Sequence, residues 1–168
     1  MRTMENARPR LCVETSIISY LTARPTRDLV TQAHQQLTHE WWDEKRMEFE
    51  FFVSELVIEE AERGDPEAAK RRLDCIANCP ILPITPEASE LAEWLIRAVP
   101  LPERAGADAL HLAVAAFHGM EYFLTWNCRH LANGFVRHRL TQVEPERGLT
   151  TPTICTPEEL YDEDKDMD

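Results

Sequence analysis

Short apolar runs alternate with longer amphipathic segments along the chain, and this alternation constrains the fold more than any other feature of the sequence. A strand covered on both faces reads as a short apolar run, whereas a helix packed on a sheet carries an apolar stripe with helical spacing. Strands that alternate with helices form mostly parallel sheets with helices on both faces. The predicted strands are residues 10–13, 49–53, 81–84, 121–125 and 153–155. The sequence therefore predicts a protein of the α/β class.

Capping residues mark where the predicted helices begin. Ser54 is a good N-cap for a helix that runs through Ala61, and Asp65 followed by Pro66 starts another that runs through Ile76. The other predicted helices are about 26–48, 86–99 and 107–117, with a short one capped by Asn127 and a capped turn at 156–159. The helix at 26–48 is expected to have one apolar side, made of Leu29, Val30, Ala33, Leu37, Trp41 and Trp42.

The length of 168 residues is that of one domain, which can bury a core without disulfides or metals. We expect a flexible leader over residues 1–9, a single domain over 10–161 and an acidic disordered tail over 162–168. The tail holds five acids and one lysine, so it is expected to stay in solvent. The alternative is that it contacts a basic partner.

The five cysteines indicate a reducing compartment, because their number is odd and no CxxC pair occurs. No apolar run reaches the ~18–20 residues that span a bilayer, and the polar start of the chain lacks the apolar core of a secretory signal. We therefore expect a cytoplasmic protein with no membrane attachment. The formal net charge of −12 disfavours a protein held to nucleic acid mainly by its overall field. It does not exclude a nuclease, since a metal can meet the phosphate.

Acids that directly follow a strand are the first candidates for a functional site, because ligands of open parallel sheets bind outside the carboxyl ends of the strands. Glu14 follows the first predicted strand and is followed by Thr15 and Ser16. A carboxylate at this place can ligate a hard cation, with Ser16 holding it in position. The alternative is an ordinary helix start that is capped by Thr15 or Ser16.

Two further acids stand on predicted helices near the same edge. One of Glu59 and Glu60 is expected to point back over the sheet end while the other is solvated. The alternative is an ordinary surface helix with both acids in solvent. Asp108 stands in an apolar helical stretch, with His111 one turn later on nearly the same face. A buried charge needs a partner or a metal, but an acid in the first turn of a helix is also favoured by the helix dipole.

The segment after the fourth predicted strand adds polar and aromatic groups. Asn127 is either a helix cap or a weak oxygen ligand. Arg129 and His130 are candidate contacts for phosphate. Trp126 either stacks on a nucleic-acid base or packs in the core.

Together these stretches resemble the PIN-domain family, and in particular the VapC-like toxins of bacterial toxin–antitoxin pairs. The similar stretches are VETSIISYL (13–21), VSELVIEEAERGD (53–65), GADALHLAVAAFHGMEYFLTWNCRHL (106–131) and, more loosely, TPEEL (156–160). The third stretch is the most specific, since it joins an Asp-Ala helix to a strand that ends in Thr-x-Asp or its equivalent.

The resemblance implies a three-layer α/β/α fold with a central, mostly parallel sheet of four to five strands. It also implies an acidic pocket that binds Mg²⁺ or Mn²⁺ and hydrolyses RNA, a small antitoxin as partner, and a homodimer. The family's three acids fall on Glu14, on Glu60 (with Glu59 as the fallback) and on Asp108. Its fourth position falls on Asn127, and its hydroxyl near the first acid falls on Ser16.

Two positions depart from the family pattern. The first is normally Asp, whereas Glu14 carries one more methylene. The fourth is normally acidic, whereas Asn127 is neutral, which removes a negative charge and disfavours a second metal. Three carboxylates still suffice for one Mg²⁺, but both departures also agree with a site that no longer cuts.

The leading hypothesis is an endoribonuclease that prefers single strands, with Glu14, Glu60 and Asp108 as metal ligands and Asn127 or a carboxylate orienting the nucleophile. The alternative is a weakened or inactive PIN-fold module that binds RNA or a protein partner. A structure-specific DNA nuclease is disfavoured, because the sequence has no long inserted arch and no basic arm.

Overall fold

A five-stranded parallel sheet forms the centre of the computed structural model, which describes residues 7–161. The strand order is β3-β2-β1-β4-β5, and every neighbouring pair is parallel. The strands are β1 (Arg10–Val13), β2 (Glu50–Ser54), β3 (Ile81–Leu82), β4 (Tyr122–Leu124) and β5 (Thr153–Cys155). All five coincide with predicted strands, although β3 is only two residues long. The predicted acidic tail and residues 1–6 of the predicted leader lie outside the described residues.

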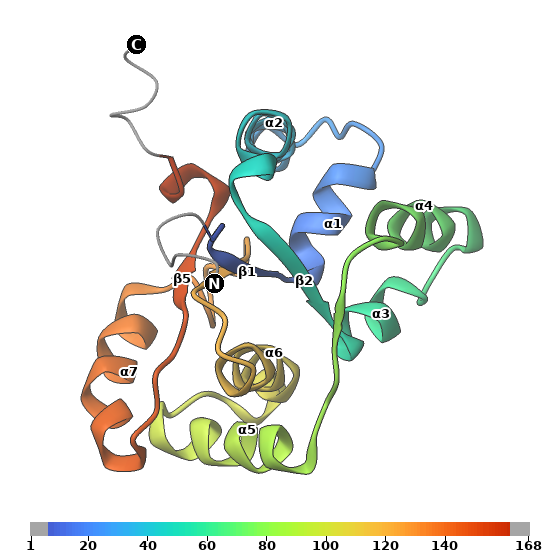
Figure 1. Ribbon diagram of the computed structural model, residues 1–168. Coiled ribbons are helices and arrows are strands. Elements are labelled where there is room, and N and C mark those ends of the chain that lie inside the picture. Colours follow the sequence, from blue (N-terminus) through green and yellow to red (C-terminus); the bar gives the residue numbers. More distant parts are fainter. Residues whose placement is uncertain (1–6, 162–168) are drawn as a thin grey trace.

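Helices cover both faces of the sheet, as Figure 1 shows. They are α1 (Thr15–Thr22), α2 (Leu29–Lys45), α3 (Glu55–Ala61), α4 (Pro66–Ile76), α5 (Pro86–Ala98), α6 (Gly106–Phe117) and α7 (Gly134–Arg147), with short turns of 3-10 helix at η2 (Arg46–Glu48), η3 (Glu103–Ala105) and η4 (Pro157–Glu159). Leu11 and Val13 of β1 pack with α1 to α4, whereas Cys12 between them packs with α5 to α7. The predicted three-layer α/β/α fold is therefore confirmed.

The order of the strands changes direction at β1. Strands β2 and β3 lie on one side of β1, and β4 and β5 lie on the other. Val13 pairs with Leu124, so the residues that follow them, Glu14 and Thr125, leave the sheet side by side. Such a switch point is where open parallel sheets bind their ligands.

Side-chain caps begin several helices where the sequence predicts them. Ser54 Oγ accepts from Val57 N at 3.2 Å, and Asp65 and Thr85 each accept from the backbone N–H three residues later. Helix α1 is different, because Glu14 itself caps it by accepting from Ser16 N. The alternative prediction of a cap at Thr15 or Ser16 is therefore wrong.

The predicted apolar side of α2 is wrong over the amino-terminal half of that helix. Leu29 and Val30 are 78% and 65% exposed. Thr38 is fully buried instead, where its hydroxyl accepts from Trp126 Nε1 at 2.7 Å and donates to the His34 carbonyl at 2.5 Å. Polar groups take the inner positions because each finds a hydrogen-bond partner there.

Helix α7 is absent from the sequence prediction, which places only a short helix after Asn127. Residues 128–131 form a turn, and the regular helix begins at Gly134. The buried residues of α7 are Val136, Leu140 and Val143. Their spacing of four and three residues is the helical signal that the polar composition of this segment obscures.

All five cysteines are free thiols, and burial raises the pKa of Cys12 to about 12. Among residues 7–161, no helix combines the length and apolar character needed to cross a membrane.

Candidate active site

Glu14 stands at the switch point between β1 and β4. Its Oε2 accepts from Ser16 N at 3.1 Å, from the Ser16 hydroxyl, and from Thr125 Oγ1 at 2.8 Å. The residue is 7% exposed, and in the described part of the chain all of its donors are neutral. The other oxygen, Oε1, accepts no hydrogen bond from residues 7–161, yet it is not enclosed. Glu14 thus presents one free carboxylate oxygen.

Glu60, on α3, is tied to the segment that follows β1 and to α6. Its Oε1 accepts from Thr15 Oγ1 at 3.0 Å and pairs with His111 Nε2. Burial raises the pKa of Glu60, but hydrogen bonds from His111 and Thr15 and the charges of His111 and Arg63 outweigh it, so the net pKa is lowered. Glu60 is therefore ionised at neutral pH.

The two neighbouring acids of α3 have different surroundings. Glu59 is exposed, whereas Glu60 is only 25% exposed. Of the two predicted candidates, Glu60 is the one that faces the end of the sheet.

Asp108 lies in the first turn of α6 and pairs with His130, whose Nδ1 is 2.9 Å from Asp108 Oδ2. Both side chains are half-buried, at 19% and 16% exposed. The predicted neighbour of Asp108, His111, points to Glu60 instead. The two histidines consequently bridge elements that are distant in sequence, one from α6 to α3 and the other from the turn after β4 to α6.

Asn127 caps the turn that carries His130. Its Oδ1 accepts from Arg129 N at 3.2 Å and from His130 N at 3.0 Å. The backbone N–H of Asn127 donates to Thr125 Oγ1 at 2.9 Å. The amide oxygen is thus engaged as a cap, while the side chain of Arg129 is exposed on the same turn.

Trp126 is 8% exposed and packs between α1 and α2. Its Nε1 donates to Thr38, its backbone N donates to Ser16 Oγ at 2.9 Å, and His34 stacks on its ring at 4.0 Å between centroids and 12° between planes. These contacts favour packing over base stacking for Trp126. The more exposed member of the stack is His34. It was not a candidate from the sequence, because the predicted apolar side of α2 does not include it.

The donor types at this edge suit a hard divalent cation, since Glu14, Glu60 and Asp108 all offer carboxylates near the ends of β1 and β4. The positions of these carboxylates fit a metal ion less well than their chemistry does. Within residues 7–161, no group of three His, Cys, Asp or Glu side chains is placed to hold a metal ion. Glu60 and Asp108 hold histidines instead. Metal binding by these three acids stays a prediction.

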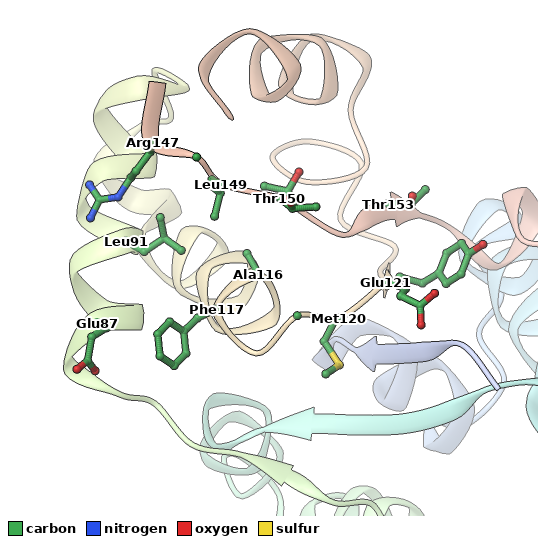
Figure 2. A pocket seen from close by; sticks show the side chains of 14 residues that line it. Glu87, Leu91, Ala116, Phe117, Met120, Glu121, Arg147, Leu149, Thr150 and Thr153 are labelled. Atoms are coloured by element: carbon green, nitrogen blue, oxygen red, sulfur yellow. The ribbon is translucent and has the colours of Figure 1, made fainter. Parts of the chain in front are cut away.

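A cavity of about 760 Å³ lies at the opposite end of the strands, where residues that precede β4 and β5 meet α5 and α6 (Figure 2). Its lining includes Leu91, Phe117, Met120, Glu121, Arg147 and Thr150. None of the candidate site residues lines it. The candidate site therefore lies outside this cavity.

One family of known proteins matches the chain over most of its length. The PIN domain model matches residues 11–131, a range that contains Glu14, Glu60, Asp108 and Asn127. No curated protein matches the chain at a significant level.

Two solved toxin structures are similar in fold. VapBC2 from Rickettsia felis, bound to a DNA fragment from its promoter, has a TM-score of 0.54 and 12% identity, over 87% of this chain and 97% of that one. VapC20 from Mycobacterium tuberculosis, a toxin that cleaves the sarcin–ricin loop, has a TM-score of 0.55 and 20% identity, over 71% of this chain and 91% of that one. At such low identity the likeness concerns the fold alone. Because the family model matches well over half of the sequence, the chain belongs to the PIN-domain family.

Proposed function

We propose that this protein is a metal-dependent endoribonuclease that cuts single-stranded RNA at the site of Glu14, Glu60, Asp108 and Asn127. The observation that carries the proposal is the buried carboxylate of Glu14. It stands at the switch point of the sheet with one free oxygen and no cationic partner among the described residues. A buried charge in this state needs a positive ligand, and a divalent cation with a phosphate is a suitable one.

The chain's own residues hold this site in position. Ser16 and Thr125 fix one oxygen of Glu14, so the other keeps a defined direction. Thr15 and His111 fix Glu60 in the same way. The side-chain N–H₂ of Asn127 makes no hydrogen bond within residues 7–161 and is not enclosed, so it is able to donate to a phosphate oxygen or orient a water.

Mg²⁺ or Mn²⁺ is the cofactor that this proposal requires. Glu14, Glu60 and Asp108 would hold it, and when bound it would neutralise phosphate charge and activate water for attack. Since Asn127 is neutral, we expect one ion rather than two.

We further propose that the protein is the toxin of a toxin–antitoxin pair, works in the cytoplasm, forms a homodimer and binds a small antitoxin. The PIN family and the similarity in fold to VapC toxins support this proposal. The promoter DNA and the sarcin–ricin loop belong to those two proteins and do not identify the partner or substrate of this one.

A second candidate is a PIN-fold module that binds RNA or a protein without cutting. It is favoured by the neutral Asn127 and by the pairing of Glu60 and Asp108 with histidines, which leaves no three-donor group among the described residues. Metal binding separates the two candidates.

The first test is Mn²⁺ binding by calorimetry to the wild type, to Asp108→Asn and to Glu14→Gln. We expect micromolar to millimolar binding by the wild type and its loss in both variants, because each removes a charged ligand. A wild type that binds no Mn²⁺ would contradict the enzymatic proposal and favour the binding module.

Cleavage of single-stranded RNA provides the second test, with Glu60→Gln and Glu59→Gln as a matched pair. The two residues are adjacent on α3, but only Glu60 faces the site. We expect Mn²⁺-stimulated cleavage to fall about a hundredfold or more in Glu60→Gln and to stay at the wild-type rate in Glu59→Gln. Equal rates in the two variants would remove Glu60 from the site.

A further inference from the structure

An aromatic cluster, made of Tyr20, His34 and Trp126, lies directly beside the candidate site. Trp126 N donates to Ser16 Oγ, and Ser16 N donates to Glu14. Tyr20 stands edge-on to both other rings, at 6.3 Å from Trp126 and 6.1 Å from His34. The cluster is therefore two hydrogen bonds away from the central carboxylate of the site.

His34 is the member of this cluster that is open to solvent on one side. Its ring is half-buried, and a parallel stack at 4.0 Å covers one of its faces with Trp126. Since Tyr20 also flanks the ring, we infer that solvent reaches the imidazole at the face opposite Trp126. Neither ring nitrogen makes a hydrogen bond within residues 7–161, and neither is enclosed.

Thr38 connects the backbone of His34 to the ring of Trp126. Its buried hydroxyl donates to the His34 carbonyl at 2.5 Å and accepts from Trp126 Nε1 at 2.7 Å, which holds the indole against this turn of α2. Val30 precedes His34 by one turn on the same side of α2 and is 65% exposed, so an apolar side chain in solvent lies next to His34 on the helix surface. This is the character of a stacking platform rather than of a solvated polar residue.

The negative charge of the protein favours an RNA contact that does not depend on attraction of phosphates. With a net charge of −12, the chain cannot rely on its overall field to attract phosphates. Stacking of bases on aromatic rings does not depend on net charge and tolerates every base, because each base has a π face.

We propose that His34 is a substrate-positioning residue, on whose free face one base of a single-stranded RNA stacks beside the scissile phosphate. The inference rests on the proposed ribonuclease function, since it names the substrate contact of the same site. Trp126 packs against the inner face of His34, and His34 makes the base contact that was one of the two alternatives for Trp126.

The test is binding of fluorescein-labelled single-stranded RNA in EDTA, read by anisotropy, together with Mn²⁺-dependent cleavage. His34→Ala should bind about tenfold more weakly and raise KM rather than lower kcat, because a stacking partner is lost. His34→Phe keeps an aromatic face and should bind close to wild type. His39→Ala is the matched control, since His39 lies on the same helix and is exposed, and it should be unchanged.

Oligonucleotides with one abasic nucleotide, moved along the strand, separate stacking from a merely structural role. One position should weaken wild-type binding about tenfold and leave His34→Ala unaffected. The inference is overturned if His34→Ala binds like wild type, if no abasic position distinguishes the two proteins, or if the wild type does not bind single-stranded RNA.

These results are separable from the fate of the proposed function. A wild type that binds RNA through His34 but does not cut it supports the platform and contradicts the enzymatic activity. A wild type that cuts RNA with a KM equal to that of His34→Ala supports the activity and overturns the platform.

Discussion

Residue by residue, the candidate site is organised by the hydroxyl groups of Ser16 and Thr125. Ser16 is central, because its side chain donates to Glu14 and accepts from Trp126 N at 2.9 Å. Thr125 acts in parallel, donating to Glu14 and accepting from Asn127 N. Each hydroxyl thus connects the carboxylate to the backbone after β4, and the two segments that leave the switch point are held together by side chains.

Ser16→Ala is expected to lower the free energy of unfolding by about 1–3 kcal/mol, because the Trp126 N–H loses its acceptor. Urea denaturation measures the change. Ser19→Ala is the matched control, since Ser19 lies on the same helix and its hydroxyl makes no hydrogen bond among the described residues. Equal stabilities of the two variants would show that the hydrogen bond from Trp126 contributes nothing.

Among the secondary-structure elements, α2 stands out because its two halves are packed differently. Its carboxyl-terminal half buries Trp41, whose Nε1 donates to the Leu160 carbonyl at 2.9 Å. Its amino-terminal half leaves Leu29 and Val30 in solvent and turns Gln35 inward, and Thr38 is buried near the middle of the helix. The helix therefore carries a polar inner surface next to the candidate site and an apolar outer surface at the same end.

Substitutions in the two halves of α2 should differ sharply in their effect on stability. Leu29→Gln with Val30→Thr should change the free energy of unfolding by no more than about 0.5 kcal/mol, because both side chains are already exposed. Trp41→Ala should cost about 3–5 kcal/mol, because it opens a cavity in the core. Thermal or urea unfolding checks both values, and a large loss in the first variant would contradict the orientation of α2.

In the molecule as a whole, the last two helical segments of the described chain, α7 and η4, are joined by an ion pair. Arg137 of α7 pairs with Glu159 of η4 at 2.7 Å, and Glu159 also accepts from Thr156 N at 2.9 Å. This contact fastens the turn after the edge strand β5 to the helix that precedes that strand. Glu159 is 45% exposed, so the pair is screened by solvent and contributes modestly.

The contribution of Glu159 should depend on pH in a defined direction. Burial raises the pKa of Glu159, but hydrogen bonds from Thr156 and the Arg137 guanidinium outweigh it, so the folded pKa lies below its ordinary value of 4.5. A lowered folded pKa stabilises the protein above pH 4.5, and this stability is lost as the pH falls through the folded pKa.

Unfolding of the wild type and of Glu159→Gln between pH 7 and pH 3 measures this effect. The wild type should be more stable at neutral pH by less than about 1 kcal/mol, and the difference should shrink toward the acid end. A difference that stays constant over this range would show that the ionised carboxylate is not its source.

Local patterns in the sequence were enough to predict the fold class and most of the strands and helices. Five strands appear where short apolar runs predict them, and α3, α4 and α5 begin where their capping residues predict, because apolar spacing and capping are local properties of neighbouring residues. Helix α1 was predicted only as the alternative for the segment that follows Glu14, and α7 was missed altogether. The buried residues of α7 are Val136, Leu140 and Val143. A stripe of three residues in a polar segment is too weak a local signal.

The sequence also indicated which acids belong to the candidate site, since they follow strands or stand in apolar helices. Ser16 was also predicted to hold Glu14, and it donates to that carboxylate. The other partners became visible only in the folded structure: Thr125 for Glu14, His111 for Glu60 and His130 for Asp108. The tertiary structure also decided which side of α2 faces inward. The physical reason is that most of these contacts join residues far apart in the chain. Their geometry depends on how strands and helices pack, and no local pattern records that packing.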